Sequence, residues 1–488
     1  MVPGEQETEM KQLCERLSSL KVWDLLWALI VLLLPLTSVP FIVRLVRSDV
    51  VAAPSGILLP LFLAGWCIPL IISGRSLSEN ASPLILFVLT GICATLISFF
   101  RTIPDYKGHS PVSPSASAVL TVLVGFSFYL ASLLRHGDRK RLVSTFRLLD
   151  ISGAVVCLWT LAQAFFWYKD QRYPEWMKDI QFMLSIGSLY RQRFVGFTLE
   201  PSWLAHQLNL LYLPFWFAAS VTGFSAFRFR KGPLTIERIL FCTGALVLFL
   251  TLSRVGLAAF LLGAAFFALV TVRRLISAIS ARFAGKHKKT IFLLLVLSVL
   301  LLLAGAAFGI LRLLTKLDFR MAGLFSIDLK NRSDPVFYLA EKLSLAARFV
   351  YWDGGISIFN SHPFLGVGLG HAGFYLPGLL NDHAYRLIEV RKLLFRTNTL
   401  LNIKSLWIRI LAETGIIGFS FFFVWYLSCF LGNLTRLRSA DLLKRTAAWM
   451  GCFALLAFIL EGFSLDTFAL PYLWFSSGLA AGAGEITS

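Results

Sequence analysis

Residues 290–313 read TIFLLLVLSVLLLLAGAAFGILRL, and Arg312 is the only charged residue in this run. About 20 apolar residues in an α-helix are enough to cross the hydrocarbon core of a bilayer, because the helix rises about 1.5 Å per residue. Lys288 and Lys289 precede the run and Lys316 follows it. The stretch therefore predicts a membrane-spanning helix.

Apolar runs of this kind recur along the whole chain. Of its 488 residues, 57% are hydrophobic and 15% are charged, and its mean hydropathy is +0.72. Soluble domains carry about 25% charged residues, so this composition argues against a soluble protein. We predict an all-α polytopic membrane protein with about 12 transmembrane helices. The expected spans are roughly 22–43, 54–73, 82–100, 115–134, 146–168, 201–222, 236–252, 254–272, 290–313, 406–431, 447–464 and 466–483.

Short basic loops predict the orientation of these spans. The net charge is +19, and Lys and Arg are dense in residues 136–141, 228–231, 273–289 and 436–445. Cytoplasmic loops carry such an excess, so we place these loops and a polar N-terminal tail, residues 1–21, in the cytoplasm. The first apolar run is then retained rather than cleaved as a signal peptide. Because the charge lies between spans, it indicates membrane lipids or an anionic substrate as partners, and no nucleic acid.

One long interval, residues 314–405, contains no apolar span. Together with residues 169–200 it falls on the outer side, since long loops translocate largely regardless of charge. Within it, residues 338–359 predict an amphipathic helix, and glycines at 366, 368 and 370 predict a tight turn. The domains we expect are transmembrane helices 1–9 (22–313), a large external helical loop (314–405), and helices 10–12 with a C-terminal tail (406–488).

Two groups of candidate residues lie before the external loop. The first contains Arg191, Arg193 and Glu200, and Glu200-Pro201-Ser202 is typical of a helix start, so Glu200 is either an acid or base or only a cap. The second is Ser253-Arg254, between two apolar spans. Arginine is costly there unless it has a partner or reaches a wet cavity, although it can also extend to the membrane surface.

Two further groups belong to the external loop and its end. Arg348 has the planar fork of donors that suits phosphate, with Tyr351 and Trp352 beside it, unless this is a solvated helix face. Lys404 and Trp407 precede Arg409 and Glu413, which are spaced to form an ordinary i,i+4 pair.

Together the four groups suit displacement at a phosphate-bearing carbon: cations neutralise a leaving diphosphate and a carboxylate or histidine removes a proton. No aspartate cluster of metal-ligand type stands on the outer side, and the seven cysteines have no disulfide or zinc spacing. We therefore expect no metal and no cofactor.

Four motifs occur in order between about 190 and 420: Arg…Gly…Glu-Pro-Ser, Ser-Arg-x-Gly, Arg-x-x-x-Trp…His-Pro-x-x-Gly-x-Gly and Ala-Glu-x-Gly-x-x-Gly. This order resembles the O-antigen ligase and Wzy-type polysaccharide polymerase superfamily. The resemblance implies a GT-C-like, inverting, metal-independent glycosyltransferase of the bacterial inner membrane, with its active site facing the periplasm. Its donor would be a glycan on undecaprenyl diphosphate, used in lipopolysaccharide or exopolysaccharide biosynthesis for the cell envelope. Arg193, Arg254 and Arg348 would hold the diphosphate.

The chain departs from the ligase-like pattern just before the tenth span. A histidine is expected there, whereas this sequence has Asn402-Ile-Lys404-Ser405. We therefore favour an O-antigen or exopolysaccharide polymerase, with Glu200 as the acid or base and Lys404 as an additional cation. His371 completes the predicted substrate-binding set. The alternatives are an O-antigen ligase acting on the lipid A core, and a lipid-linked oligosaccharide flippase. For a polymerase, the resemblance also implies a flippase and a chain-length regulator as protein partners.

Overall fold

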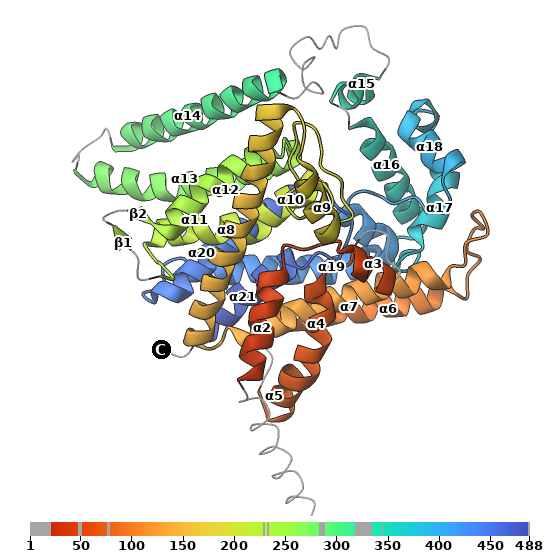
Figure 1. Ribbon diagram of the computed structural model, residues 1–488, viewed down its shortest axis with the longest axis horizontal. Helices are drawn as coiled ribbons and strands as arrows, with labels where there is room; N and C mark the ends of the chain where they lie inside the picture. The colour runs from red at the N-terminus through yellow and green to blue at the C-terminus, as the bar shows by residue number, and fades with distance from the viewer. Residues whose placement is uncertain are drawn as a thin grey trace, which may run out of the picture.

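The computed structural model describes residues 21–46, 51–75, 79–227, 230–231, 234–282, 288–317, 334–343 and 345–486 (Figure 1). The predicted N-terminal tail lies outside these residues except for Lys21, as does the part of the external loop at 318–333. The described residues are predominantly helical. The strands among them are a two-residue antiparallel pair, β1 (Arg230–Lys231) and β2 (Leu234–Thr235).

The helices of the first half of the chain follow the predicted apolar runs, except that the run at 22–43 is interrupted between Leu33 and Pro40. Asp138 begins the longest of them, because its side chain accepts a hydrogen bond from the backbone N–H of Arg141. The helices are α2 (Val22–Leu33), α3 (Pro40–Val46), α4 (Pro54–Phe62) continued through η1 (Leu63–Cys67) into α5 (Ile68–Ile72), η2 (Glu79–Ala81), α6 (Ser82–Ser98), α7 (Val112–Arg135), α8 (Arg139–Asp170) and α9 (Glu175–Leu184).

The second half continues the bundle and adds the described part of the predicted external loop, residues 334–343 and 345–405, which we call the external segment. Its helices are α10 (Pro201–Gln207) continued through η3 (Leu208–Tyr212) into α11 (Leu213–Thr222), α12 (Ile236–Leu250), α13 (Arg254–Arg282), α14 (Lys288–Leu317), α15 (Pro335–Lys342), α16 (Ala346–Ser361), α17 (Ala372–Leu379), η6 (Ala384–Arg386), α18 (Ile388–Arg396), α19 (Leu406–Arg436), α20 (Leu442–Glu461) and α21 (Tyr472–Gly484).

Several of these helices are suited to a membrane, which agrees with the predicted all-α class. Six helical segments in the described ranges are long and apolar enough to cross it: Pro54–Ile72, Val112–Arg135, Arg139–Asp170, Phe292–Leu313, Leu406–Arg436 and Leu442–Glu461. Three shorter apolar helices are Val22–Leu33, Ser82–Ser98 and Arg254–Val270. The protein is therefore a multi-pass membrane protein. The total of 12 spans and the GT-C-like arrangement stay predictions.

Close helix packing forms the centre of the bundle. Almost all of α21 is buried, and it packs against α7 and α20. Gly478 and Gly482 are four residues apart on α21. A Cβ at Gly478 would lie 2.4 Å from the Tyr129 carbonyl oxygen, and a Cβ at Gly482 would lie 2.2 Å from the Leu133 carbonyl oxygen. Small residues at this spacing let two membrane helices approach closely. At the edge of the bundle, α14 lies along α13 (Figure 1).

The external segment forms its own small hydrophobic core at one side of the bundle. Figure 1 shows α15, α16, α17 and α18 gathered at the right-hand side, and α16 packs against α19. Val350, Ile358 and Leu376 are among the buried residues of this core. The single amphipathic helix predicted over 338–359 is wrong, because α15 ends at Lys342 and α16 begins at Ala346. Two short helices, η6 and α18, follow before the start of α19.

The glycine turn docks into a break in α19. All three glycines of the turn have positive φ angles, and the backbone N–H groups of Val367 and Gly368 donate to the carbonyls of Ala412 and Glu413 at 3.0 and 2.9 Å. Gly415 breaks the helix there with φ +62° and ψ −167°. Because helical hydrogen bonds are lost at this break, the turn supplies partners for the exposed carbonyls. These glycines therefore join the external segment to the bundle.

Candidate functional site

The candidate site is centred on a non-helical segment, residues 462–471, between α20 and α21. The carbonyls at the end of a helix have no partner within the helix, so the last turn of α20 leaves several acceptors available. Ser405 and Leu406, at the start of α19, donate to the carbonyl of Gly462 at 3.3 and 2.7 Å. The segment thereby holds the end of the external loop against the bundle.

Arg348 extends from the first turn of α16 to the same segment. One of its terminal nitrogens donates to the carbonyls of Phe463 and Ser464 at 3.3 and 2.7 Å. Burial lowers the pKa of Arg348, and the charge of Glu200 is the largest of the contributions that raise it again. The guanidinium therefore lies within electrostatic range of Glu200, which comes from a different part of the chain, and it stays charged at neutral pH.

Glu200 precedes α10 in an extended conformation, with Pro201 as the first helical residue. Its carboxylate accepts a 2.5 Å hydrogen bond from the Ser202 hydroxyl, and no backbone N–H of α10 uses it as a cap. Burial raises the pKa of Tyr190, the charge of Glu200 raises it further, and the charge of Arg193 lowers it. Glu200 and Arg193 therefore both lie within electrostatic range of the Tyr190 hydroxyl. This carboxylate is partly exposed and available for proton transfer.

The turn between α12 and α13 connects the two other predicted arginines. Arg193 donates from Nε to the carbonyl of Thr251 at 3.2 Å. Arg254 begins α13 and donates to the carbonyl of Leu343, at the end of α15. Ser253 caps α13, because its hydroxyl accepts from the N–H of Gly256 at 3.3 Å. The turn thus links the loop before Glu200 with the external segment that carries Arg348.

Lys404 lies beside Arg348's helix and is already paired. Its ammonium forms an ion pair with Glu389 and lies 5.1 Å from the centre of the Tyr351 ring. Its backbone N–H donates to the carboxylate of Asp466 at 3.1 Å, and Trp352 donates from its indole to the Lys404 carbonyl at 3.4 Å. Glu389 therefore offsets the charge of Lys404 in this arrangement.

Two of the predicted site residues contact other parts of the molecule, and a third is exposed. His371 is buried with its Nδ1 2.9 Å from the Ser98 hydroxyl of α6. Trp407 packs against Phe458 and donates to the Ile459 carbonyl at 3.1 Å. Arg191 is exposed, and within the described ranges it forms no hydrogen bond or ion pair.

Buried polar residues that were not predicted as site members adjoin this region. Glu461, the last residue of α20, is fully buried and accepts from Asn209 Nδ2 at 2.7 Å, with His206 Nδ1 at 3.4 Å from its other oxygen. Asn209 also donates to the Gly256 carbonyl at 2.8 Å. A sequence signal was present, because Glu461 and Asp466 interrupt the last two apolar runs. A carboxylate in such a run requires a partner or a wet cavity.

The Arg409–Glu413 pair on α19 has the structural form expected from its spacing. Arg409 Nε donates to Glu413 at 3.0 Å, and a terminal nitrogen of Arg409 donates to the Asp466 carbonyl at 2.5 Å. The predicted i,i+4 ion pair is confirmed. It holds the 462–471 segment on α19.

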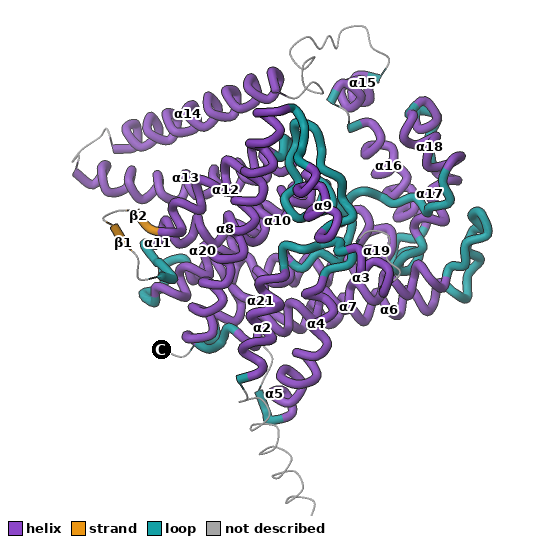
Figure 2. The backbone as a smooth tube through the Cα atoms, viewed as in Figure 1, coloured by secondary structure: helices purple, strands orange, loops and turns teal. Residues whose placement is uncertain are grey.

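The arrangement combines the Glu200 carboxylate with Arg348, which lies within its electrostatic range. Arg254 and Arg193 contribute two more cations from the adjoining turn and loop. Such a set can neutralise a diphosphate and accept a proton from a hydroxyl. Figure 2 shows long loops around α9 and α10, in the part of the chain that carries Arg193 and Glu200.

Residues 239–423 match the family model described as O-antigen ligase. The matched segment runs from α12 into α19 and includes Arg254, Arg348 and Lys404, whereas Glu200 and Glu461 lie outside it. No curated protein matches the chain.

Proposed function

We propose that this chain, whose residues 239–423 match the family model described as O-antigen ligase, polymerises oligosaccharide repeats carried on undecaprenyl diphosphate. The observation that carries the proposal is that Arg348, bound to the Ser464 carbonyl between α20 and α21, lies within electrostatic range of Glu200 from a separate segment. On the predicted topology this site faces the periplasm, at the outer side of the inner membrane. A lipid-linked donor would reach it from the outer leaflet.

The reaction we propose is a single displacement at the anomeric carbon of the donor glycan. A hydroxyl of the acceptor repeat attacks this carbon while Glu200 takes the hydroxyl proton. The bond between the anomeric carbon and the diphosphate oxygen breaks, and undecaprenyl diphosphate leaves with the bonding electrons. A single displacement inverts the configuration at the carbon. Arg348 would neutralise the diphosphate, and Arg193 and Arg254 would support it from the adjoining turn.

Tyr351, Trp352, Ser253 and Lys404 would then have binding or positioning roles. Aromatic rings pack well against sugar rings, and Trp352 is half-buried beside Phe463. Lys404 would have to exchange Glu389 for the diphosphate before it could act as a cation on the substrate.

The polymerase is favoured over a ligase by the residues before α19. The ligase-like pattern has a histidine there, and this chain instead has Lys404 in a pair with Glu389. The description of the matching family supports the ligase as the second candidate, in which a completed glycan is passed to the lipid A core.

The test compares Glu200→Gln with Glu175→Gln. Glu175 lies on α9 in the same predicted outer loop, where it is exposed and paired with Lys178, so it is a matched control. The purified proteins in nanodiscs receive an undecaprenyl-diphosphate-linked repeat, and products are separated on gels. Loss of a general base costs about 10² to 10⁴ in rate. We expect Glu200→Gln to lose chain extension by at least about 10²-fold and the control to retain it.

Cells lacking the gene distinguish the two candidates. Surface glycans with a single repeat would indicate lost polymerisation, and long polymer retained on the carrier lipid would indicate lost ligation. Full activity of a folded Glu200→Gln protein would contradict the role assigned to that carboxylate.

A further inference from the structure

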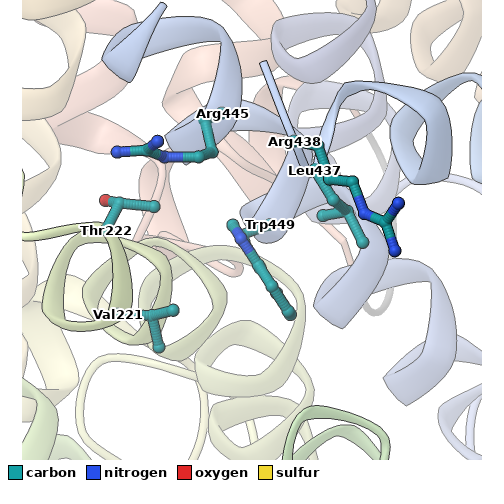
Figure 3. Close-up of a pocket in the computed structure, with 6 residues that line it drawn as sticks. All are labelled: Val221, Thr222, Leu437, Arg438, Arg445 and Trp449. Atoms are coloured by element: carbon teal, nitrogen blue, oxygen red, sulfur yellow. The ribbon is translucent and has the colours of Figure 1, made fainter. Parts of the chain in front are cut away.

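A cavity lies at the other end of α20 from the candidate site. Its volume is about 440 Å³, and its lining residues are Val221, Thr222, Leu437, Arg438, Arg445 and Trp449 (Figure 3). Arg445 is in the first turn of α20 and Glu461 is its last residue, so about 24 Å of helix separates the cavity from the candidate site. The cavity adjoins the basic loop 436–445, which is predicted to face the cytoplasm.

The lining combines an apolar floor with two cations. Trp449 and Leu437 are buried, Arg445 is half-buried and Arg438 is exposed. Figure 3 shows Trp449 between Arg445 and Thr222 on one side and Leu437 and Arg438 on the other. An apolar surface beside cationic groups is suited to a ligand that has both an anionic group and an apolar part.

The two arginines have no carboxylate partner in the part of the chain that the structure describes. The acidic residue nearest in sequence is Asp441, which is paired with Arg139 and also caps α20 by accepting from the N–H groups of Leu443 and Lys444. Arg438 and Arg445 therefore present donors that no protein carboxylate uses. Guanidinium groups form two parallel hydrogen bonds with phosphate oxygens, so phosphate is a fitting acceptor.

We propose that this cavity binds the phosphate headgroup of an anionic phospholipid from the leaflet on the predicted cytoplasmic side. Arg438 and Arg445 contact the phosphate, and Trp449, Val221 and Leu437 contact the glycerol and the start of the acyl chains. Basic pockets between membrane helices on this side are suited to such headgroups. Thr222 contributes little, because its hydroxyl already donates to the Ala218 carbonyl and lies 2.8 Å from the Thr446 hydroxyl. The proposal does not depend on the glycosyltransferase function.

The test measures binding of phosphatidylglycerol to the purified full chain by native mass spectrometry. The double variant Arg438→Gln/Arg445→Gln removes the cavity cations. Lys140→Gln/Lys444→Gln is the matched control, since it removes the same charge from the same predicted face and neither lysine lines the cavity. Each basic residue near a membrane surface contributes about fivefold in affinity, so we expect the cavity variant to bind about 25-fold more weakly.

Three results would overturn the proposal. The first is equal loss of lipid from the control, which would indicate general surface charge. The second is unchanged binding in a cavity variant whose circular dichroism matches the unsubstituted protein. The third is release of the bound lipid by millimolar inorganic phosphate, which would indicate a site for free phosphate. Retention of lipid by the control and in the presence of phosphate supports the lipid site.

Discussion

Arg348 is expected to contribute to both stability and catalysis, and the two effects can be separated. Its hydrogen bond to the Ser464 carbonyl is 2.7 Å long and the one to Phe463 is 3.3 Å, so the first dominates. A hydrogen bond from a charged donor contributes about 1.5–3 kcal/mol. Arg348→Gln should therefore lower the free energy of unfolding by roughly that amount.

The same substitution should also lower kcat, and by more than its loss of stability would cause. Removing one preorganised donor to a developing anion lowers kcat by about 10² to 10³. Arg348→Lys keeps the charge but loses the planar fork, so its activity should lie between those of Arg348→Gln and the unsubstituted protein. Arg391→Gln is the matched control, because Arg391 is an exposed arginine on α18 of the same external segment.

The assay follows extension of a lipid-linked repeat by protein in nanodiscs, at a temperature where thermal unfolding curves show each variant folded. A folded Arg348→Gln protein whose turnover is within about threefold of the unsubstituted protein would refute the electrostatic role, since the expected loss is about 10² to 10³. A similar loss in Arg391→Gln would also refute it, because the effect would then reflect net charge on the external segment.

Three further predictions concern packing, pH and metal ions. Gly482→Ala should destabilise the bundle by about 1–3 kcal/mol in thermal unfolding, because the added Cβ would lie 2.2 Å from the Leu133 carbonyl oxygen. Gly378→Ala is the control, since nothing lies within 4 Å of a Cβ at that position. Equal stability of the two variants would contradict the close packing at Gly482. Burial and the charge of Glu389 raise the pKa of the Tyr351 hydroxyl. The stability that the neutral phenol contributes is therefore present below about pH 10 and lost as the pH rises further. Tyr351→Phe should flatten this alkaline decline in stability, whereas Tyr385→Phe, at an exposed tyrosine, should leave it unchanged. EDTA should leave turnover unchanged, because arginines neutralise the leaving diphosphate in the proposed mechanism, and a loss restored by added Mg²⁺ would require a different one.

The helical membrane class followed from the sequence because it depends on local properties. An apolar run of about 20 residues has few alternatives to a membrane helix, whatever the rest of the chain does. The run at 290–313 lies within α14, and the run at 406–431 lies within α19. Helix boundaries within the external segment were less accurate. At the break after Lys342, Arg254 donates to the Leu343 carbonyl, a long-range contact that no local pattern reveals.

The residue types of the candidate site were also visible in the sequence, but their partners were not. Glu200 could be a cap or a reacting group, and the sequence leaves both open because each needs an acidic residue before a helix. In the structure, the Glu200 carboxylate accepts a hydrogen bond from the Ser202 hydroxyl and lies within electrostatic range of Arg348. Likewise, His371 lies near Arg348 in the sequence, yet it packs against Ser98 of α6.

The sequence by itself determined the membrane class, the order of the apolar helices and the cationic character of the external segment, because composition and short-range spacing specify all three. Only the tertiary structure decided that the segment between α20 and α21 binds Arg348, Lys404 and Arg409, and that Glu461 is buried with Asn209. These contacts join residues far apart in the chain. They depend on how the helices pack, because unpaired carbonyls and carboxylates in a membrane must find donors wherever the fold brings them.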